Sequence, residues 1–99
     1  MSFKKFRWSQ VYESSEEELV AFLGARGIHG QRIHADAATP QTEQQTTSTT
    51  TVWCAEGSLV INAGPRRTSL QPGDALQLDT DTAYTIQPGI ADCVYYLTR

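Results

Sequence analysis

The chain has 99 residues, of which 19% are charged, and its formal net charge is −3. A chain of this length makes one domain with one modest core. Its acidic balance gives no reason to expect nucleic acid or an anionic membrane as a partner. No apolar run approaches the roughly 20 residues of a membrane span. The basic start is followed by polar and acidic residues, not by the apolar stretch of a secretory signal, so we expect a cytoplasmic protein.

A capped helix is predicted over residues 15–26. Ser15 and the three glutamates after it form a capping box, in which the serine hydroxyl accepts from the third backbone N–H and Glu18 reaches back. The glutamates also lie at the positive end of the helix dipole. One apolar stripe follows at helical spacing: Leu19, Phe22 and Leu23. Gly27 is expected to end the helix in a left-handed conformation.

Short strands are predicted for most of the remaining chain. A threonine-rich segment, 42–51, passes directly into 52–55, and we expect one strand with hydroxyls on both faces; the alternative is a disordered linker. Apolar residues between turn signals predict further strands at 31–34, 59–63, 68–70, 75–78, 83–87 and 93–98. Many short strands separated by such turns are typical of a β-sandwich or barrel.

Cysteine and histidine offer little chemistry in this chain. In a cytoplasmic protein, Cys54 and Cys93 are expected to be free, buried and apolar in behaviour, because disulfides are rare there. A catalytic cysteine would need a neighbouring base. The two histidines are His29, expected in a solvated turn, and His34, expected to be half-buried on a strand.

Two segments together resemble the core of a small single-domain cupin. The first is Glu56-Gly57 with the apolar strand that follows it. The second is Leu70-Gln-Pro-Gly-Asp-Ala-Leu-Gln-Leu78, followed by a four-residue turn and Ala83-Tyr84. An early Trp8, the capped helix and Gly89-Ile-Ala-Asp-Cys93 are similar to one subgroup of bacterial cupins. The resemblance covers nearly the whole chain.

The resemblance implies an all-β fold, namely a cupin-type double-stranded β-helix, or jelly-roll barrel, with one N-terminal α-helix. One domain would span residues 1–99, with a helix and a strand in 1–34 and the barrel core in 42–99. We also expect a homodimer, because so short a chain buries a limited core.

The glycines of both segments have physical reasons. Gly57 lies where a hairpin between two barrel strands needs a positive φ. Gly73 and Asp74 open a strand after Pro72, and the aspartate side chain is able to bond its own turn. These features build the fold and carry no chemistry.

The metal-binding positions of the cupin family fall on other residue types in this chain. The resemblance places the family's glutamate at Thr50 and its last histidine at Tyr84. Its first two histidines fall, in two possible registers, at Gln44 and Thr46 or at Glu43 and Gln45. All four positions lack their usual residue, and iron, zinc and nickel favour imidazole or thiolate ligands. We therefore expect no metal and no cofactor.

Three functions remain open from the sequence, and it does not decide whether the protein is an enzyme. The first is a degenerate cupin acting as a metal-free small-molecule binding or scaffold domain. Its candidate pocket consists of Glu43, Gln44, Gln45, Thr46, Thr50 and Tyr84. The second is a metal-independent enzyme on a small polar substrate, sugar-like or acidic, with Tyr84 as acid and Glu43 or His34 as base. The third is a structural subunit whose barrel interior is filled by side chains, with the Tyr84 hydroxyl bonded to a threonine.

Overall fold

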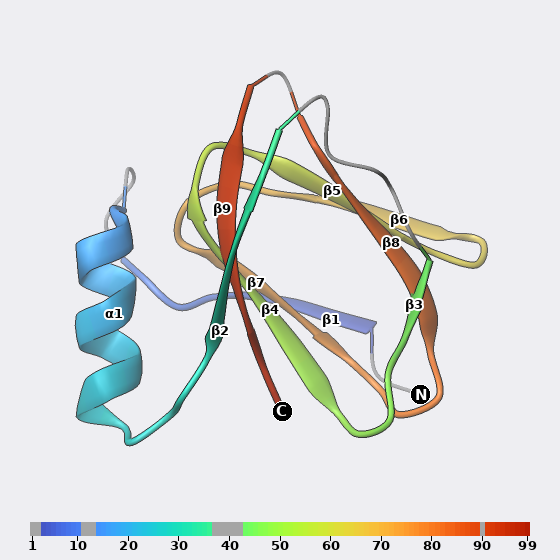
Figure 1. Cartoon of the computed structure of the whole chain (residues 1–99), viewed down its shortest axis with the longest axis horizontal. Coiled ribbons are helices and arrows are strands. Elements are labelled where there is room, and N and C mark those ends of the chain that lie inside the picture. The colour runs from blue at the N-terminus through green and yellow to red at the C-terminus, as the bar shows by residue number, and fades with distance from the viewer. Residues whose placement is uncertain (1–2, 11–13, 37–42, 90) are drawn as a thin grey trace.

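The chain folds into two antiparallel sheets that face each other, with one helix outside them (Figure 1). A computed structural model describes residues 3–10, 14–36, 43–89 and 91–99. The larger sheet has five strands in the order β1-β7-β4-β9-β2, and the smaller has four in the order β3-β8-β5-β6. Apart from the β5-β6 hairpin, neighbouring strands are non-consecutive in the chain, and this connectivity is that of a jelly roll. The predicted all-β jelly-roll fold is therefore observed.

The elements have the following bounds. The five-stranded sheet contains β1 (Phe3–Arg7), β2 (Gln31–Ala35), β4 (Thr50–Glu56), β7 (Asp74–Leu78) and β9 (Cys93–Thr98). The four-stranded sheet contains β3 (Gln44–Gln45), β5 (Leu59–Ala63), β6 (Arg66–Leu70) and β8 (Ala83–Pro88). The helix α1 spans Glu16–Ala25. Among the described residues, no helix combines the length and the apolar character needed to cross a membrane.

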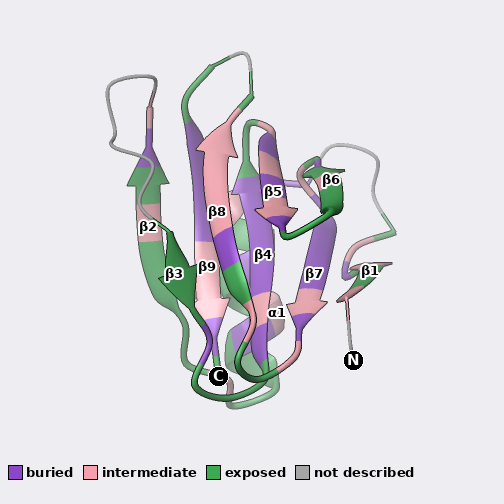
Figure 2. Cartoon of the chain, turned by 90° about the vertical axis from the view of Figure 1, so that its right-hand side faces the viewer, coloured by how far each residue is buried: buried purple, intermediate pink, exposed green. Residues whose placement is uncertain are grey.

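Side chains along the central strands alternate between the two faces of the sheet, so the core has two parts. On β4, Val52 and Cys54 face the other sheet, whereas Trp53 and Ala55 face α1. Successive side chains of a strand point to opposite faces, so a strand buried on both faces must be apolar at every position. Figure 2 shows the result, with β4 buried along most of its length and the edge strands β2 and β3 mainly exposed.

The helix α1 covers the outer face of the five-stranded sheet. Its predicted cap is present, because the Ser15 hydroxyl accepts from the Glu18 N–H at 3.3 Å. Gly27 ends it with a φ of 67°, as predicted. The buried stripe of Leu19 and Leu23 packs on aromatic rings from the sheet and the N-terminal segment, namely Phe6, Trp8 and Trp53. Phe22, also on α1, contacts the rings of Trp8 and Trp53.

A polar contact on its first turn ties α1 to β2 and β9. The Tyr96 hydroxyl donates to the Glu16 carboxylate at 2.6 Å, and Arg32 pairs with the same carboxylate. These two donors lower the pKa of Glu16, the Arg32 hydrogen bond being the larger cause. The helix is therefore fixed by polar contacts at its edge as well as by apolar burial beneath it.

One strand was not predicted from the sequence, and one strand prediction is wrong. Residues 3–7 form β1, which pairs with β7, although the sequence indicated only a basic cluster there. The threonine-rich segment is not one strand: β3 covers two residues, and the chain leaves the sheet before β4 begins at Thr50. Thr42, the start of the predicted strand, lies outside the described residues.

The break in the threonine-rich segment has a clear cause at Thr46. Its N–H donates to the Thr82 carbonyl at 2.9 Å, and its own carbonyl accepts from the Asp81 N–H at 2.9 Å. Its hydroxyl donates to the Asp79 carbonyl at 2.6 Å and accepts from the Thr82 N–H at 2.8 Å. Four bonds thus attach Thr46 to the polar turn before β8, and the chain crosses there from one sheet to the other.

Candidate functional site

A cavity of about 290 Å³ opens between the two sheets, inside the barrel. Three strands line it with alternate residues. Gln31, Ile33 and Ala35 come from β2, and Tyr95, Leu97 and Arg99 come from β9 and the residue after it. Tyr84, Ile86 and Pro88 come from β8 on the facing sheet. The period of two follows from strand geometry, in which every second side chain points to the same face.

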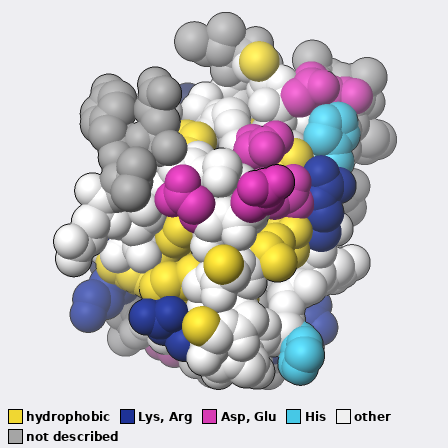
Figure 3. Space-filling model, turned by 90° about the vertical axis from the view of Figure 1, so that its left-hand side faces the viewer, with side chains coloured by type: hydrophobic (Ala, Val, Ile, Leu, Met, Phe, Trp, Pro, Cys, Tyr) yellow, Lys and Arg dark blue, Asp and Glu magenta, His cyan; other side chains and the backbone are white. Residues whose placement is uncertain are grey.

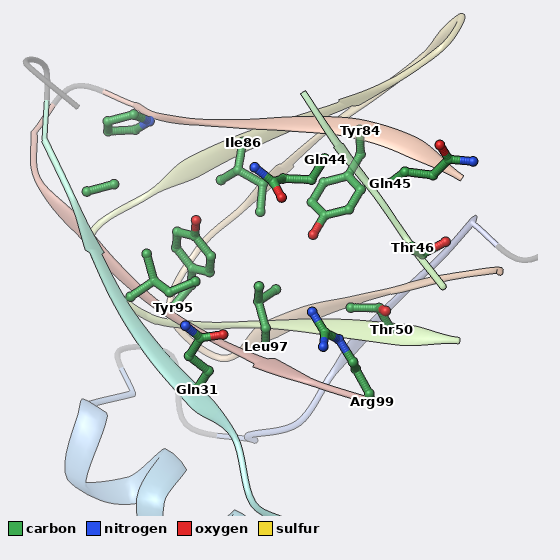
Figure 4. Close-up of a pocket in the computed structure, with 13 residues that line it drawn as sticks. Gln31, Gln44, Gln45, Thr46, Thr50, Tyr84, Ile86, Tyr95, Leu97 and Arg99 are labelled. Carbon is green, nitrogen blue, oxygen red and sulfur yellow. The ribbon is translucent and has the colours of Figure 1, made fainter. Parts of the chain in front are cut away.

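Five of the six predicted pocket residues lie on the wall of this cavity: Gln44, Gln45, Thr46, Thr50 and Tyr84. β3 pairs with β8 so that Gln44 lies directly opposite Tyr84. The side chains of Gln44 and Gln45 point in opposite directions, with Gln44 directed toward the cavity (Figure 4). Thr46 follows two residues after Gln44 and is buried. Gln44 and Thr46 from one register and Gln45 from the other all line the cavity, so the structure does not choose between the two registers.

Glu43 and His34 are not among the cavity-lining residues. Glu43 is exposed. His34 is exposed, not half-buried as predicted, because the alternation on β2 turns Ile33 and Ala35 inward and His34 outward. The His34 Nε2 atom lies 3.4 Å from the Asp92 carboxylate. Neither proposed base is thus brought to Tyr84. His29 is exposed, in agreement with its prediction.

The two buried threonine hydroxyls already have partners in the fold. Thr46 is bonded to the turn before β8, and the Thr50 hydroxyl donates to the Ser48 carbonyl at 3.0 Å. Tyr84 behaves differently, since none of the described threonines bonds its hydroxyl. The expected Tyr84–threonine bond is therefore not present among the described residues.

Tyr84 and Tyr95 bring two phenols to the same cavity from facing sheets, and both hydroxyls point into it (Figure 4). Burial raises the pKa of Tyr84, and the nearby Arg99 charge partly opposes this effect. Burial likewise raises the pKa of Tyr95 to about 12. Both phenols are therefore protonated near neutral pH and are able to donate a hydrogen bond.

Arg99 is the only charged residue among the described residues of the cavity wall. Its guanidinium points into the cavity from below Leu97 (Figure 4). No described acidic side chain forms an ion pair with it. Arg99, Tyr95 and Gln31 were not predicted from the sequence as cavity residues. The signal that identifies them is the strand period, once 31–35 and 93–98 are known to face Tyr84.

These side chains do not fit a divalent metal of the kind that imidazole and carboxylate hold. The positions assigned by the resemblance offer an amide, two hydroxyls engaged elsewhere and a protonated phenol, whereas transition metals favour imidazole or thiolate. A guanidinium on the same wall repels a cation. Among the residues that the structure describes, no group of three or more His, Cys, Asp or Glu side chains is placed to bind a metal.

Both cysteines are free and buried, as predicted. They belong to the core between the sheets and are absent from the cavity wall. Burial raises the pKa of the Cys54 thiol to about 12, so this thiol is a packing group and not a nucleophile.

Solved structures share this architecture over nearly the whole chain. A DUF861 family protein from Thermotoga maritima has a TM-score of 0.65 at 8% identity, and the match covers 96% of each chain. A cupin superfamily protein from Desulfitobacterium hafniense has a TM-score of 0.54 at 12% identity, covering 97% of this chain and 74% of that one. The chain has a cupin fold.

A third solved structure that matches is a protein of unknown function from Rhizobium leguminosarum. Its TM-score is 0.54 at 12% identity, with 91% of this chain and 96% of that chain covered. No protein-family model matches the sequence, and no curated protein matches it significantly. At such low identity the likeness establishes the cupin fold, while activity has to be argued from the cavity itself.

Proposed function

We propose that this cupin is a metal-free domain that binds a small organic molecule in its barrel. The observation that carries the proposal is the cavity of about 290 Å³, which the interior side chains leave open. Ligand pockets are typically concave, mostly apolar and furnished with a few convergent polar groups. The cavity is concave and has convergent polar groups, but its wall is more polar than usual: residues with polar side-chain ends outnumber the aliphatic side chains, which come from three strands.

Four polar side chains of the cavity wall support binding because the described part of the chain offers them no hydrogen-bond partner. The hydroxyls of Tyr84 and Tyr95 and the amides of Gln31 and Gln44 form no side-chain hydrogen bond with any described residue. The two tyrosine hydroxyls are not among the buried polar atoms that lack a partner, and Gln31 and Gln44 are exposed, so all four groups are accessible to a ligand. A molecule with matching polar groups would satisfy them.

The chemistry of the wall also favours a metal-free site. The inward positions carry neutral oxygen and amide donors, and Arg99 adds a positive charge. Bringing a divalent cation beside the Arg99 guanidinium costs electrostatic energy, because the two positive charges repel each other. We therefore favour metal-free binding of a small molecule over the metal-dependent chemistry of the cupin family.

A metal-independent enzyme is the alternative, with Tyr84 as general acid. Its protonated phenol faces the cavity and suits that role. Acid–base catalysis also requires a base within reach of the substrate. No carboxylate or imidazole occurs among the described residues of the wall, so binding without catalysis accounts better for the residues present.

The test combines metal analysis with a cavity-filling substitution. Untagged protein, purified without added metal, is analysed for iron, zinc, nickel and manganese before and after incubation with each ion. Binding of a library of small organic fragments is then followed by ligand-observed NMR. We expect no stoichiometric metal and a set of fragments that bind the wild-type protein but not Leu97→Trp, in which an indole fills the cavity.

The matched control is Val20→Trp, which adds the same ring on the exposed side of α1, where Val20 is 50% exposed. It should leave fragment binding unchanged. A stoichiometric metal ion, or fragments that bind Leu97→Trp as well as wild type, would contradict the proposed function. Circular dichroism of both variants establishes that a loss of binding is not a loss of fold.

A further inference from the structure

We propose that the ligand of the barrel cavity is a small monocarboxylate, whose charged end pairs with Arg99 and whose apolar part packs on Ile33, Ile86 and Leu97. This inference rests on the binding function proposed above and names its ligand class. It is argued from the charge of the cavity, its hydrogen-bond donors, its shape and its apolar wall.

The charge of the cavity is opposite to that of the molecule. The chain carries a net charge of −3. Figure 3 shows acidic side chains gathered on the face that carries α1, whose first turn contains Glu16, Glu17 and Glu18. The cavity wall has no acidic residue among those described, and its single charge is that of Arg99. Arg99 is exposed at the cavity, and a positive charge with no acidic side chain beside it on the described wall favours an anion.

The uncharged polar groups add donors around the same space. The Tyr84 and Tyr95 hydroxyls point into the cavity, as do the amides of Gln31 and Gln44 (Figure 4). Each phenol is protonated near neutral pH and each amide carries two N–H donors. An anion accepts hydrogen bonds and donates none, so a wall rich in unpartnered donors suits it. Hydrogen bonds to a charged acceptor are also stronger than neutral ones.

A single carboxylate fits this wall better than a phosphate. A planar guanidinium matches a carboxylate in a two-bond geometry. Phosphate sites usually combine several cations with backbone N–H groups at a helix N-terminus or a glycine-rich loop. The described part of the cavity wall is built from strands and contains neither feature. One guanidinium therefore indicates one negative charge.

Aliphatic side chains on the wall indicate that the other end of the ligand is apolar. Ile33 and Leu97 come from the five-stranded sheet, and Ile86 faces them from β8. The volume of about 290 Å³ lies at the lower limit of small-molecule pockets, so the ligand is smaller than a typical drug. The combination describes an amphipathic acid with a compact apolar group.

The test uses three monocarboxylates, namely acetate, butyrate and benzoate, each paired with its neutral primary amide. Binding is followed by ¹⁵N-edited NMR titration of the wild type, Arg99→Gln and Arg67→Gln, with sodium chloride and inorganic phosphate titrated as ion controls. Arg67 is an exposed cation on β6, outside the cavity wall. We expect butyrate or benzoate to bind at least tenfold more tightly than its amide, with shifts at Tyr84, Tyr95 and Leu97.

The Arg99→Gln substitution should distinguish recognition of the ligand's charge from recognition of its shape. In Arg99→Gln the preference for the acid over its amide should disappear, while Arg67→Gln should keep it. Equal binding of acids and amides to the wild type, or tighter binding of phosphate, would overturn the carboxylate assignment and leave the binding function standing. If neither acids nor amides shift any cavity residue, the carboxylate assignment fails. If the fragment library also fails to bind, the binding function fails with it.

Discussion

The Arg7 guanidinium donates to the Asp74 carboxylate, with 2.8 Å between Nη1 and Oδ1, and so joins the edge strand β1 to the start of β7. The second oxygen of Asp74 accepts from the Gln71 N–H at 3.0 Å, which closes the turn that the sequence predicted. A Cβ atom on Gly73 would overlap the same guanidinium. The Gly73-Asp74 pair therefore forms its own turn and also binds the Arg7 guanidinium.

Removing the Asp74 carboxylate should destabilise the fold. The side chain is only 7% exposed, and Asp74→Ala would remove the hydrogen bond from the Gln71 N–H and the ion pair with Arg7. A hydrogen bond to a charged group contributes about 1.5–3 kcal/mol. Urea denaturation should show a loss of this size. The control is Lys4→Ala on the exposed side of β1, which should change stability by less than about 0.5 kcal/mol. Equal effects of the two substitutions would refute this account of Asp74.

Two glycine substitutions should act in opposite directions. Gly57 has a φ of 69°, and a Cβ there would overlap the Asp92 carbonyl oxygen, so Gly57→Ala should destabilise the protein by more than about 1 kcal/mol. Gly24 lies inside α1 with nothing within 4 Å of an added Cβ. Gly24→Ala should therefore stabilise by about 0.4–1 kcal/mol. Melting temperatures of both variants check the signs, and two losses would show that the space around Gly24 is not free.

The features that the sequence predicts well are those with a local backbone cause. The Ser15 cap, the left-handed Gly27 and the turn before Asp74 each depend on residues close in the chain, so their signals lie within a few positions. The end of β3 is different. It is set by bonds between Thr46 and a turn more than thirty residues later, and no local pattern in a run of threonines marks that position.

The residues of the cavity likewise fall into those that the sequence could predict and those that it could not. Gln44, Thr50 and Tyr84 could be proposed because a resemblance assigned them, whereas Arg99 lies one residue beyond a strand and opposite Tyr84 only in the folded barrel. A sequence that shows an alternating strand does not show which sheet faces it. The positive charge of the cavity, on which the ligand proposal rests, could therefore not be predicted from the sequence, because it depends on how the two sheets pack.

Both cysteines should be unreactive in the folded protein. Cys54 is fully buried and Cys93 nearly so, and burial raises the pKa of both thiols, that of Cys54 to about 12. Since the thiolate is the reactive form, Ellman's reagent at pH 8 should label neither residue in the native state and both in guanidinium chloride. Rapid stoichiometric labelling of the native protein would show that this core opens readily.

Alkaline pH should destabilise the protein through its tyrosines. Burial raises the pKa of Tyr95 from 10.0 to about 12, so the unfolded chain loses this proton first as the pH rises. Stability from this group is complete below about pH 10 and falls between pH 10 and 12, by roughly 2 kcal/mol. Tyr84 and Tyr96 shift in the same direction, with burial as the largest cause for each. Cys54 adds to the loss from a lower pH, because its ordinary pKa is 9.0.

The variant Tyr95→Phe isolates the contribution of one phenol. The free energy of unfolding of the wild type and of Tyr95→Phe is measured by urea denaturation at pH 8, 10 and 11.5. Between pH 10 and 11.5 the free energy of unfolding should fall less in the variant than in the wild type, because the variant lacks the Tyr95 proton. This difference is expected even if the substitution changes stability at pH 8. Tyrosinate absorbance at 295 nm, followed over the same range, should show one fewer late-titrating phenol. Identical declines in both proteins would mean that Tyr95 ionises as it does in water, and that the cavity wall around it is open to solvent.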